Sequence, residues 1–274
     1  MLCEKINLKD ISNLKSSKAF MDIYIPGNSE EINKDKKRKT IIICPGGGYG
    51  YTSDREAEPI ALNFISRGFN AIVLRYSLEP NRFPTSLLEL ASVINYTRSM
   101  SNEWNVDKDK IIVCGFSAGG HLAGSIGVLW NDRLISENLN IANENVKPNG
   151  LILCYPVING LEFAHKGSFD NLLGEEANDD KRKEVSLERL VSKDTPKTFL
   201  WHTFDDDVVP VENSLLFASS LRKNNIPFEL HIYPSGVHGL SLANELTAKS
   251  GDINHINSHA STWFNLLIEW IETI

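Results

Sequence analysis

The stretch that decides the fold is IIVCGFSAGGHLAG, residues 111–124, where an apolar run meets a glycine-flanked serine and then an apolar helical segment. Gly115 and Gly119 allow the backbone to turn sharply between the two elements, because glycine tolerates tight conformations. Such a turn lifts the hydroxyl of Ser117 above the edge of a sheet and points a helix N-terminus at it. The stretch therefore predicts a strand, a tight turn that presents Ser117, and a helix.

Short β-branched runs bounded by turn residues recur on both sides of this stretch. Most of them are apolar throughout, which suits strands that are covered on both faces of a parallel sheet. The predicted strands are Phe20–Ile25, Thr40–Cys44, Ala71–Tyr76, Ile111–Gly115, Leu151–Tyr155, Phe199–His202 and Phe228–Tyr233.

Segments with helical periodicity lie between these runs. Ser53 and Glu56 have the spacing of a capping box, which predicts a helix that starts there and runs toward Arg67. Further helices are predicted near Pro84 and after Ser117, Val211 and His259. The alternation of strands and helices predicts a single α/β domain over residues 1–274, with a mostly parallel, doubly wound sheet flanked by helices.

Residues 160–196 do not follow this alternation. The segment is long, charged and interrupted by Gly167, Gly174 and Pro196. Excursions of this length within a compact domain are usually functional or form a small subdomain. We expect a lid or cap inserted over the site.

The charge balance argues against two classes of partner. Lys and Arg total 28 against 35 Asp and Glu, which gives a net charge of −7 and a surface that repels nucleic acid and anionic membranes. The basic run at residues 34–39 is interpreted as a solvated loop. The first residues have no apolar core or cleavage pattern of a signal peptide, and no apolar run has membrane-spanning length, so we expect a cytoplasmic protein.

The sequence does not predict a metal or a cofactor. Cys3, Cys44, Cys114 and Cys154 are widely spaced, and three of them lie in strand-like runs, which favours buried, inert thiols. The run of three acids at residues 205–207 leaves a hard-cation site as an alternative, but no second acidic group has metal-loop spacing.

A second glycine-rich strand end lies at residues 41–51, IIICPGGGYGY. Glycines without side chains can present backbone N–H groups to an oxyanion, so Gly47 and Gly48, together with Ala118, are candidates for an oxyanion hole. A phosphate-binding loop is the alternative for this pattern. The lysine of that motif is missing, and the spacing of a dinucleotide-binding loop is not met because Tyr51 stands at its last position.

A serine hydroxyl needs a neighbouring imidazole to accept its proton before it becomes a good nucleophile. His238 follows the last predicted strand in the loop PSGVHG, where its side chain can reach the carboxyl edge of the sheet. His202 and His231 lie inside predicted strands, which favours packed structural roles. His121 lies on the helix after Ser117 and is interpreted as lining the site or packing beneath it.

An acidic residue must orient that imidazole. The run FDDDVVP at residues 204–210 follows an apolar strand, and Asp206 stands in the register of a D-x-x-V-P loop. Asp205 and Asp207 would point elsewhere on neighbouring peptide units. The chain thus contains the serine, the aspartate and the histidine in the order expected on a hydrolase scaffold.

At this point the chain resembles the bacterial esterase branch of the α/β-hydrolase family that is described as acetyl-xylan-esterase-like or sugar-hydrolase-like. The residues that carry the resemblance are CPGGGYGYTSDREAEPIA (44–61), VCGFSAGGHLA (113–123), FLWHTFDDDVVPVENS (199–214), FELHIYPSGVHGLSLA (228–243) and, in the insertion, AHKGSFDNLLG (164–174).

The resemblance implies an α/β-hydrolase fold, Ser117 as nucleophile with Asp206 and His238 as partners, and no cofactor. It also implies a small-molecule ester substrate with a short acyl group, such as an acetylated sugar. One departure is Pro45, where lipase-like relatives carry a histidine that supports the glycine loop. Dienelactone hydrolases share the fold but use a cysteine where this chain has Ser117.

Substrate contacts are predicted for Tyr49, Tyr51, His121 and His165. Packing against the neighbouring helix explains the two tyrosines equally well. Packing beneath the site is the alternative for His121, and a surface position is the favoured alternative for His165. Two other functions stay open. One is a serine peptidase similar to the catalytic domain of prolyl oligopeptidase, although such enzymes usually carry a large N-terminal domain. The other is a catalytically idle hydrolase fold used for binding. A homo-oligomer also stays open.

Overall fold

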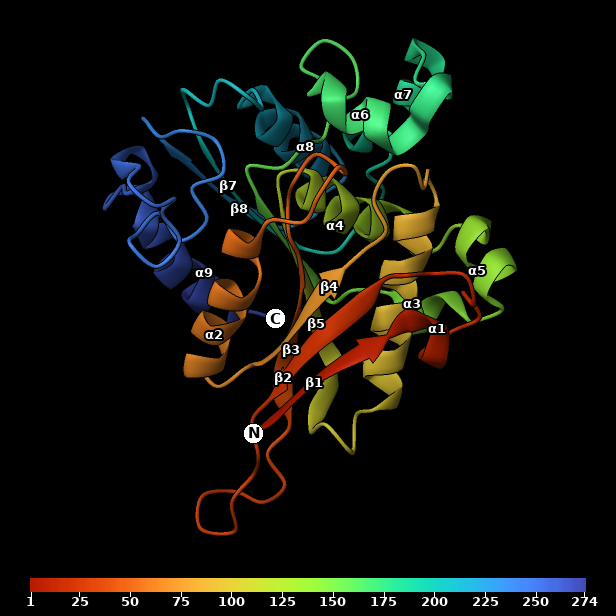
Figure 1. Ribbon diagram of the computed structural model, residues 1–274, viewed down its shortest axis with the longest axis vertical. Helices are drawn as coiled ribbons and strands as arrows, with labels where there is room; N and C mark the ends of the chain where they lie inside the picture. The colour runs from red at the N-terminus through yellow and green to blue at the C-terminus, as the bar shows by residue number, and fades with distance from the viewer.

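The computed structural model describes residues 1–274, which are organised around an eight-stranded sheet (Figure 1). Its spatial order is β1-β2-β4-β3-β5-β6-β7-β8. The strands are β1 (Leu2–Asn7), β2 (Phe20–Ile25), β3 (Arg38–Cys44), β4 (Asn70–Arg75), β5 (Val106–Phe116), β6 (Gly150–Cys154), β7 (Thr198–Thr203) and β8 (Phe228–Tyr233).

The sheet is parallel from β4 to β8, and β1 and β2 add two antiparallel strands at one edge. The expectation of a mostly parallel sheet is therefore confirmed. Strand β1 was not expected from the sequence. Its residues, LCEKIN, are mostly exposed and include two adjacent charged side chains, so it lacks the continuous apolar run that marks the central strands.

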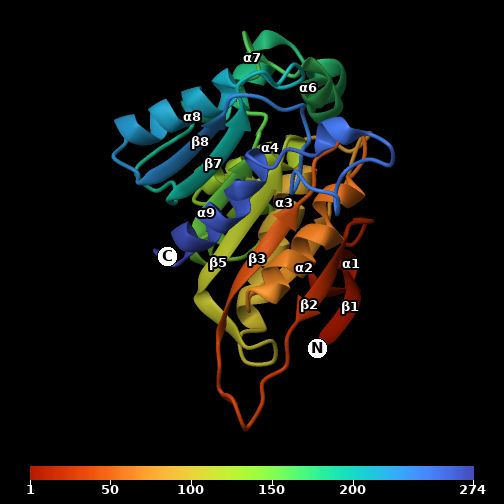
Figure 2. The same cartoon turned by 90° about the vertical axis from the view of Figure 1, so that its left-hand side faces the viewer.

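Helices cover both faces of the sheet, as Figure 2 shows with α2 and α9 on the near side. They are α1 (Leu8–Ile11), α2 (Glu58–Ser66), α3 (Thr85–Ser99), α4 (Ala118–Leu129), α5 (Arg133–Leu139), α6 (Lys166–Leu173), α7 (Asp179–Glu184), α8 (Glu212–Lys223) and α9 (Trp263–Ile271). Short 3₁₀ turns lie at η1 (Asp54–Glu56), η2 (Asn143–Val146), η3 (Gly174–Glu176), η4 (Leu187–Arg189), η5 (Ile253–His255) and η6 (Ala260–Thr262).

The two faces of the sheet form two separate cores because successive side chains of a strand point in opposite directions. In β3, Ile42 belongs to the core that includes residues of α3, α4 and α8, whereas Ile41 and Ile43 belong to the core that includes residues of α2 and α9. All three isoleucines are fully buried. Burial on both faces explains why the central strands read as continuous apolar runs.

The predicted capping box at Ser53 and Glu56 is wrong. The Ser53 side chain makes no capping hydrogen bond, and a 3₁₀ turn at Asp54–Glu56 precedes α2, which begins at Glu58. The carboxylate of Glu56 is buried and turned toward the glycine loop after β3, where it finds backbone and hydroxyl donors. The helix does end near Arg67 as expected, and Gly68, which follows it, has a positive φ of 84°.

Residues 160–196 contain α6, α7 and two 3₁₀ turns, and Figure 1 shows α6 and α7 at the top of the molecule. The segment contacts the glycine loop directly, because the Asn171 amide donates to the carbonyl oxygen of Gly48 at 2.9 Å. Among the cysteines, Cys44, Cys114 and Cys154 are buried free thiols, as expected, and Cys3 is exposed. None of the helices combines the length and the apolar character that crossing a membrane would require.

Candidate active site

Ser117 lies at the turn between β5 and α4 in a strained backbone conformation, with φ 53° and ψ −118°. Its N–H donates to the Cys154 carbonyl oxygen of the neighbouring strand at 3.0 Å. Both flanking positions require glycine, because a Cβ at either one would overlap backbone atoms. A Cβ on Gly115 would lie 2.1 Å from the Gly119 oxygen, and a Cβ on Gly119 would lie 2.1 Å from the Cys44 oxygen. The turn thus presents the hydroxyl at the carboxyl edge of the sheet.

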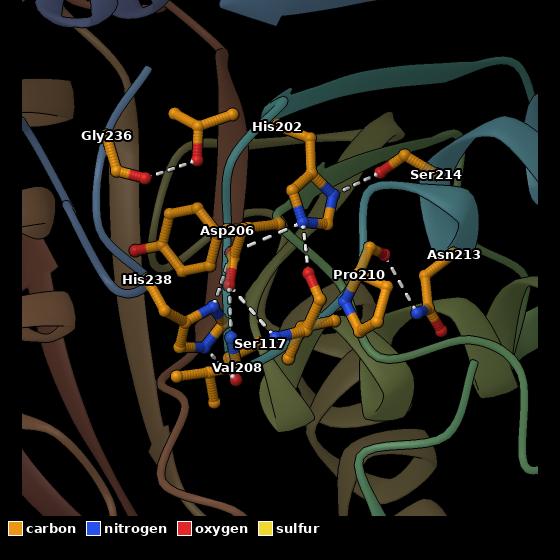
Figure 3. Close-up of polar contacts among 12 residues, drawn as sticks. Ser117, His202, Asp206, Val208, Pro210, Asn213, Ser214, Gly236 and His238 are labelled. Atoms are coloured by element: carbon orange, nitrogen blue, oxygen red, sulfur yellow. Dashed lines mark hydrogen bonds and ion pairs between the residues drawn. The ribbon is translucent and has the colours of Figure 1, made fainter. Parts of the chain in front are cut away.

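Three separated side chains meet at this edge (Figure 3). His238 Nε2 lies 2.8 Å from Ser117 Oγ, and His238 Nδ1 lies 2.7 Å from Asp206 Oδ2. Ser117 follows β5, Asp206 follows β7, and His238 follows β8. The carboxyl ends of parallel strands share one edge of the sheet, which is why residues so far apart in sequence come within hydrogen-bonding reach.

The Asp206 carboxylate is buried and accepts hydrogen bonds on both oxygens. Oδ1 accepts from the backbone N–H groups of Val208 at 3.0 Å and Val209 at 2.9 Å. Burial alone would raise the pKa of Asp206, but hydrogen bonds from His202 and His238 and from the backbone outweigh it and hold the pKa well below its usual range. The group therefore stays ionised and accepts the Nδ1–H of His238, which leaves Nε2 free to accept the serine proton.

His202 is a contact of the aspartate that the sequence did not indicate. The imidazole is fully buried, donates from Nε2 to the Val209 carbonyl oxygen at 2.9 Å, and lies 3.3 Å from Asp206 Oδ2. Its Nδ1 lies 2.8 Å from the Ser214 hydroxyl. A histidine inside a strand is usually a packed residue, and only the fold reveals that this one packs against the site.

The neighbouring acid has a different role. Asp205 Oδ1 accepts from the Gly236 N–H at 2.7 Å, and the Thr203 hydroxyl donates to the Gly236 carbonyl oxygen at 2.7 Å. These bonds tie the loop that carries His238 to the end of β7. Asp207 is exposed and makes no such contact. The side chains of Asp205, Asp206 and Asp207 therefore point in different directions, and only that of Asp206 reaches His238.

The glycine loop after β3 lies beside Ser117. Gly47 and Gly48 have positive φ values of 127° and 63°, and their N–H groups donate to no other atom of the protein. Ala118 is the first residue of α4, so its N–H has no acceptor within the helix. These three donors are the ones proposed from sequence for an oxyanion hole.

The loop is anchored without the histidine that lipase-like relatives place at the position of Pro45. Glu56 Oε2 accepts from the Gly46 N–H at 2.8 Å, and the Tyr76 hydroxyl donates to the Pro45 carbonyl oxygen at 2.6 Å. Asn171, from α6, holds the Gly48 carbonyl oxygen as described above. Side chains from three separate elements thus fix the direction of the loop.

Glu56 also links this loop to the histidine. The Tyr155 hydroxyl donates to Glu56 Oε1 at 2.7 Å and accepts from the Ser241 N–H at 2.9 Å. The Tyr155 ring packs edge-on against the His238 ring, with centroids 5.1 Å apart. The sequence contained only a misleading signal for Glu56, because its spacing from Ser53 matches a capping box.

A cavity of about 400 Å³ opens above Ser117 and is bordered by Gly47, Gly48 and His238. Of the predicted substrate contacts, Tyr51 and His165 line it. Tyr51 is 64% exposed. His165 is half-buried, and burial, followed by the neighbouring His238, lowers its pKa.

The other two predicted substrate contacts, Tyr49 and His121, lie beneath the site and do not line the cavity. They are 3% and 1% exposed. The Tyr49 hydroxyl donates to His121 Nδ1 at 2.8 Å, and His121 Nε2 donates to the Val185 carbonyl oxygen at 2.9 Å. Burial lowers the pKa of His121 to about 4, although the bond to Val185 opposes the shift. Both ring nitrogens of His121 are hydrogen-bonded within the protein, so Tyr49 and His121 pack beneath the site.

The residues do not form a metal centre, since no three His, Cys, Asp or Glu side chains are grouped so that they could hold an ion. What the arrangement can do chemically is activate a hydroxyl and stabilise an oxyanion.

The chain is similar to several known proteins. Residues 21–221 match the BD-FAE family. An endo-1,4-beta-xylanase B from Butyrivibrio fibrisolvens is 38% identical over 217 residues, which cover 78% of this chain and 34% of that protein. An acetylxylan esterase from Xylanibacter ruminicola is 30% identical over 240 residues, which cover 85% of this chain and 45% of that protein. This chain spans less than half the length of both.

Among solved structures, an acetyl ester-xyloside bifunctional hydrolase from Caldicellulosiruptor lactoaceticus is 37% identical with a TM-score of 0.83. The match covers 98% of this chain and 96% of that one. The match therefore extends over nearly the whole chain. The chain belongs to the BD-FAE family and has the α/β-hydrolase fold of carboxylic ester hydrolases.

Proposed function

We propose that this protein is a serine esterase that hydrolyses short-chain esters, acetyl esters in particular, through an acyl-enzyme intermediate. The observation that carries the proposal is the chain of contacts from Ser117 Oγ through the His238 imidazole to Asp206 Oδ2, at 2.8 and 2.7 Å. A hydroxyl, an imidazole and a buried carboxylate in this order form the arrangement that activates serine for acyl transfer.

In the first step, His238 Nε2 takes the proton of Ser117 as Oγ attacks the ester carbonyl carbon. The carbonyl oxygen becomes an oxyanion and is held by the N–H groups of Gly47, Gly48 and Ala118. Removal of one such donor typically costs a factor of about 10² to 10³ in rate. His238 then gives its proton to the leaving alcohol, and the acetyl group stays on Oγ.

In the second step, water replaces the alcohol. His238 takes a proton from the water as its oxygen attacks the acyl carbon, the same donors hold the oxyanion, and Ser117 leaves with the proton. Asp206 stabilises the imidazolium in both steps because it remains ionised and accepts the Nδ1–H.

The substrate class that we propose is acetylated sugars. Support comes from the names of the relatives, which include an acetylxylan esterase and an acetyl ester-xyloside hydrolase. A cavity of about 400 Å³ with an exposed tyrosine at its edge suits a monosaccharide or a short saccharide.

We also propose that the chain forms one hydrolase domain in which residues 160–196 act as a cap. The cap contributes His165 to the wall of the cavity and Asn171 to the glycine loop. It therefore shapes the pocket and supports the oxyanion donors.

Hydrolysis of p-nitrophenyl acetate tests the proposal. We expect activity, and a loss of about three or more orders of magnitude for Ser117→Ala. Ser125→Ala is a matched control, because Ser125 lies further along α4, away from the cavity, and its hydroxyl bonds only the His121 carbonyl oxygen. Cleavage of peptide substrates without hydrolysis of the acetate would favour a peptidase instead. Binding of acetylated sugars without any hydrolysis would favour an idle scaffold.

A further inference from the structure

One wall of the cavity gathers basic side chains from two segments of the chain. Arg55 belongs to the turn η1, and Lys249 and His255 lie between His238 and α9. All three line the cavity that contains Ser117 and His238. We refer to Arg55, Lys249 and His255 as the basic wall.

The positive charge of the basic wall is poorly compensated. Neither Arg55 nor Lys249 forms an ion pair with a carboxylate. Glu56 is the carboxylate that lines the cavity, and its oxygens already accept from Gly46 and Tyr155. In a chain with a net charge of −7, two unpaired cations beside one cavity run against the overall charge.

Arg55 is held in a fixed orientation. Its Nε donates to the Thr247 carbonyl oxygen, and its Nη2 is buried without a hydrogen-bond partner. Its Nη1 lies 3.9 Å from where a Cβ on Gly239 would stand. The guanidinium is therefore adjacent to the residue that follows His238. A guanidinium positioned in advance loses little entropy when it binds a planar anion.

His255 lies in the same wall as the cations Arg55 and Lys249. It is 5% exposed, and its Nδ1 lies 2.9 Å from Asp252 Oδ2. Burial lowers its pKa, and so do the charges of Arg55 and Lys249, whereas Asp252 opposes the shift. A further anion placed among these groups would offset the repulsion between their positive charges.

The position of the basic wall relative to the reaction identifies the part of the substrate that it faces. The leaving alcohol receives its proton from His238 Nε2, so its oxygen must lie beside that imidazole. Gly239 follows His238 in the chain and borders Arg55. The basic wall therefore lies beside the loop that carries the group that protonates the leaving alcohol.

We infer that the basic wall binds a carboxylate carried by the alcohol part of the ester. The inference rests on the proposed esterase function and narrows its substrate class to acetyl esters of acidic alcohols, acidic sugars included. Arg55 supplies a charge-assisted N–H donor from Nη1, because Nε is bonded to Thr247 and Nη2 is buried, and Lys249 adds a mobile charge at the edge.

A matched pair of substrates tests the inference. The pair is 4-acetoxybenzoate, which carries a carboxylate on its alcohol part, and 4-acetoxybenzamide, which carries a neutral amide of similar shape at the same position. We expect the wild-type protein to favour the carboxylate by about tenfold in kcat/KM, mainly through KM. The preference should shrink as the salt concentration rises, because ions screen exposed charges.

Variants assign the preference to the basic wall. We expect the ratio of the two kcat/KM values to fall about tenfold in Arg55→Gln and about threefold in Lys249→Gln. Because the Lys249 side chain is exposed and forms no hydrogen bond or ion pair, its variant is expected to fold even if loss of the Arg55 bond to Thr247 disturbs the loop. Lys223→Gln, at the exposed end of α8, makes the same change of charge away from the cavity and should leave the ratio unchanged.

Three results would overturn the inference. The first is a wild-type protein that hydrolyses both esters with equal kcat/KM, which leaves the esterase proposal intact. The second is an equal change of the ratio in Lys249→Gln and Lys223→Gln, because it would indicate net charge alone. The third is a protein that hydrolyses neither these esters nor p-nitrophenyl acetate, which contradicts the esterase function and this inference together.

Discussion

The carboxylate of Glu56 holds the N–H of Gly46 at 2.8 Å and so fixes the start of the glycine loop that faces Ser117. We expect Glu56→Ala to lower kcat by about 10- to 100-fold with little change in KM, because misaligned donors weaken transition-state binding more than substrate binding. Steady-state kinetics with p-nitrophenyl acetate measures both parameters.

Glu56→Gln is the matched control for that prediction. The glutamine oxygen can still accept from the Gly46 N–H, so we expect the kcat of this variant to stay close to the wild-type value. Thermal unfolding of both variants separates positioning from folding. If both variants lose kcat and stability in proportion, Glu56 serves only to support the structure.

The neighbouring acids provide a test of register. We expect Asp206→Asn to lower kcat by about 10⁴-fold, since an amide favours the wrong imidazole tautomer. Asp205→Asn keeps an oxygen that can accept from Gly236, so its activity should stay within a few-fold of wild type. Activity of both variants on p-nitrophenyl acetate decides the point. Equal losses would contradict the assignment of Asp206 as the orienting acid.

The flanking glycines of the serine turn predict a large effect on stability. A Cβ on Gly115 would stand 2.1 Å from the backbone oxygen of Gly119, so Gly115→Ala should cost at least about 3 kcal/mol of unfolding free energy. Gly27→Ala is the control, because a Cβ there meets nothing within 4 Å. Urea unfolding of both variants measures the difference, and a stable, active Gly115→Ala would contradict the close contact.

Buried His121 predicts a pH dependence of stability. Its pKa of about 4 lies below the ordinary value of 6.5, so the unfolded chain binds a proton in the range between them that the folded chain does not. Stability from this group is complete above pH 6.5 and is lost as the pH falls toward 4. Between pH 7 and pH 5 the loss should be about 2 kcal/mol.

A pair of histidine variants isolates that contribution. His121→Gln removes the titrating group and should flatten the fall in unfolding free energy between pH 7 and pH 5. His259→Gln, at an exposed position, should keep it. If both variants keep the wild-type slope, another group is responsible.

Much of the fold could be predicted from the sequence because burial leaves a clear pattern. The central strands are apolar on both faces, and the positions of Ser117, Asp206 and His238 at their ends follow from parallel topology. Strand β1 was missed because an exposed edge strand has no such pattern.

Side-chain direction was the part that the sequence could not specify. Tyr49 and Tyr51 are two residues apart in one glycine-rich loop, yet one bonds His121 beneath the site and the other lies at the cavity. Glu56 has the spacing of a capping residue, but its carboxylate is directed to Gly46 by the path of the loop. Such directions depend on contacts between segments that are distant in sequence.

The bond from Asn171 to the Gly48 carbonyl has a consequence for protein engineering. Trimming residues 160–196 to admit bulkier esters would also release one attachment of the catalytic loop, so a wider entrance would come with slower turnover. Redesign for broader specificity should therefore keep α6 in place and vary the outer residues around α7.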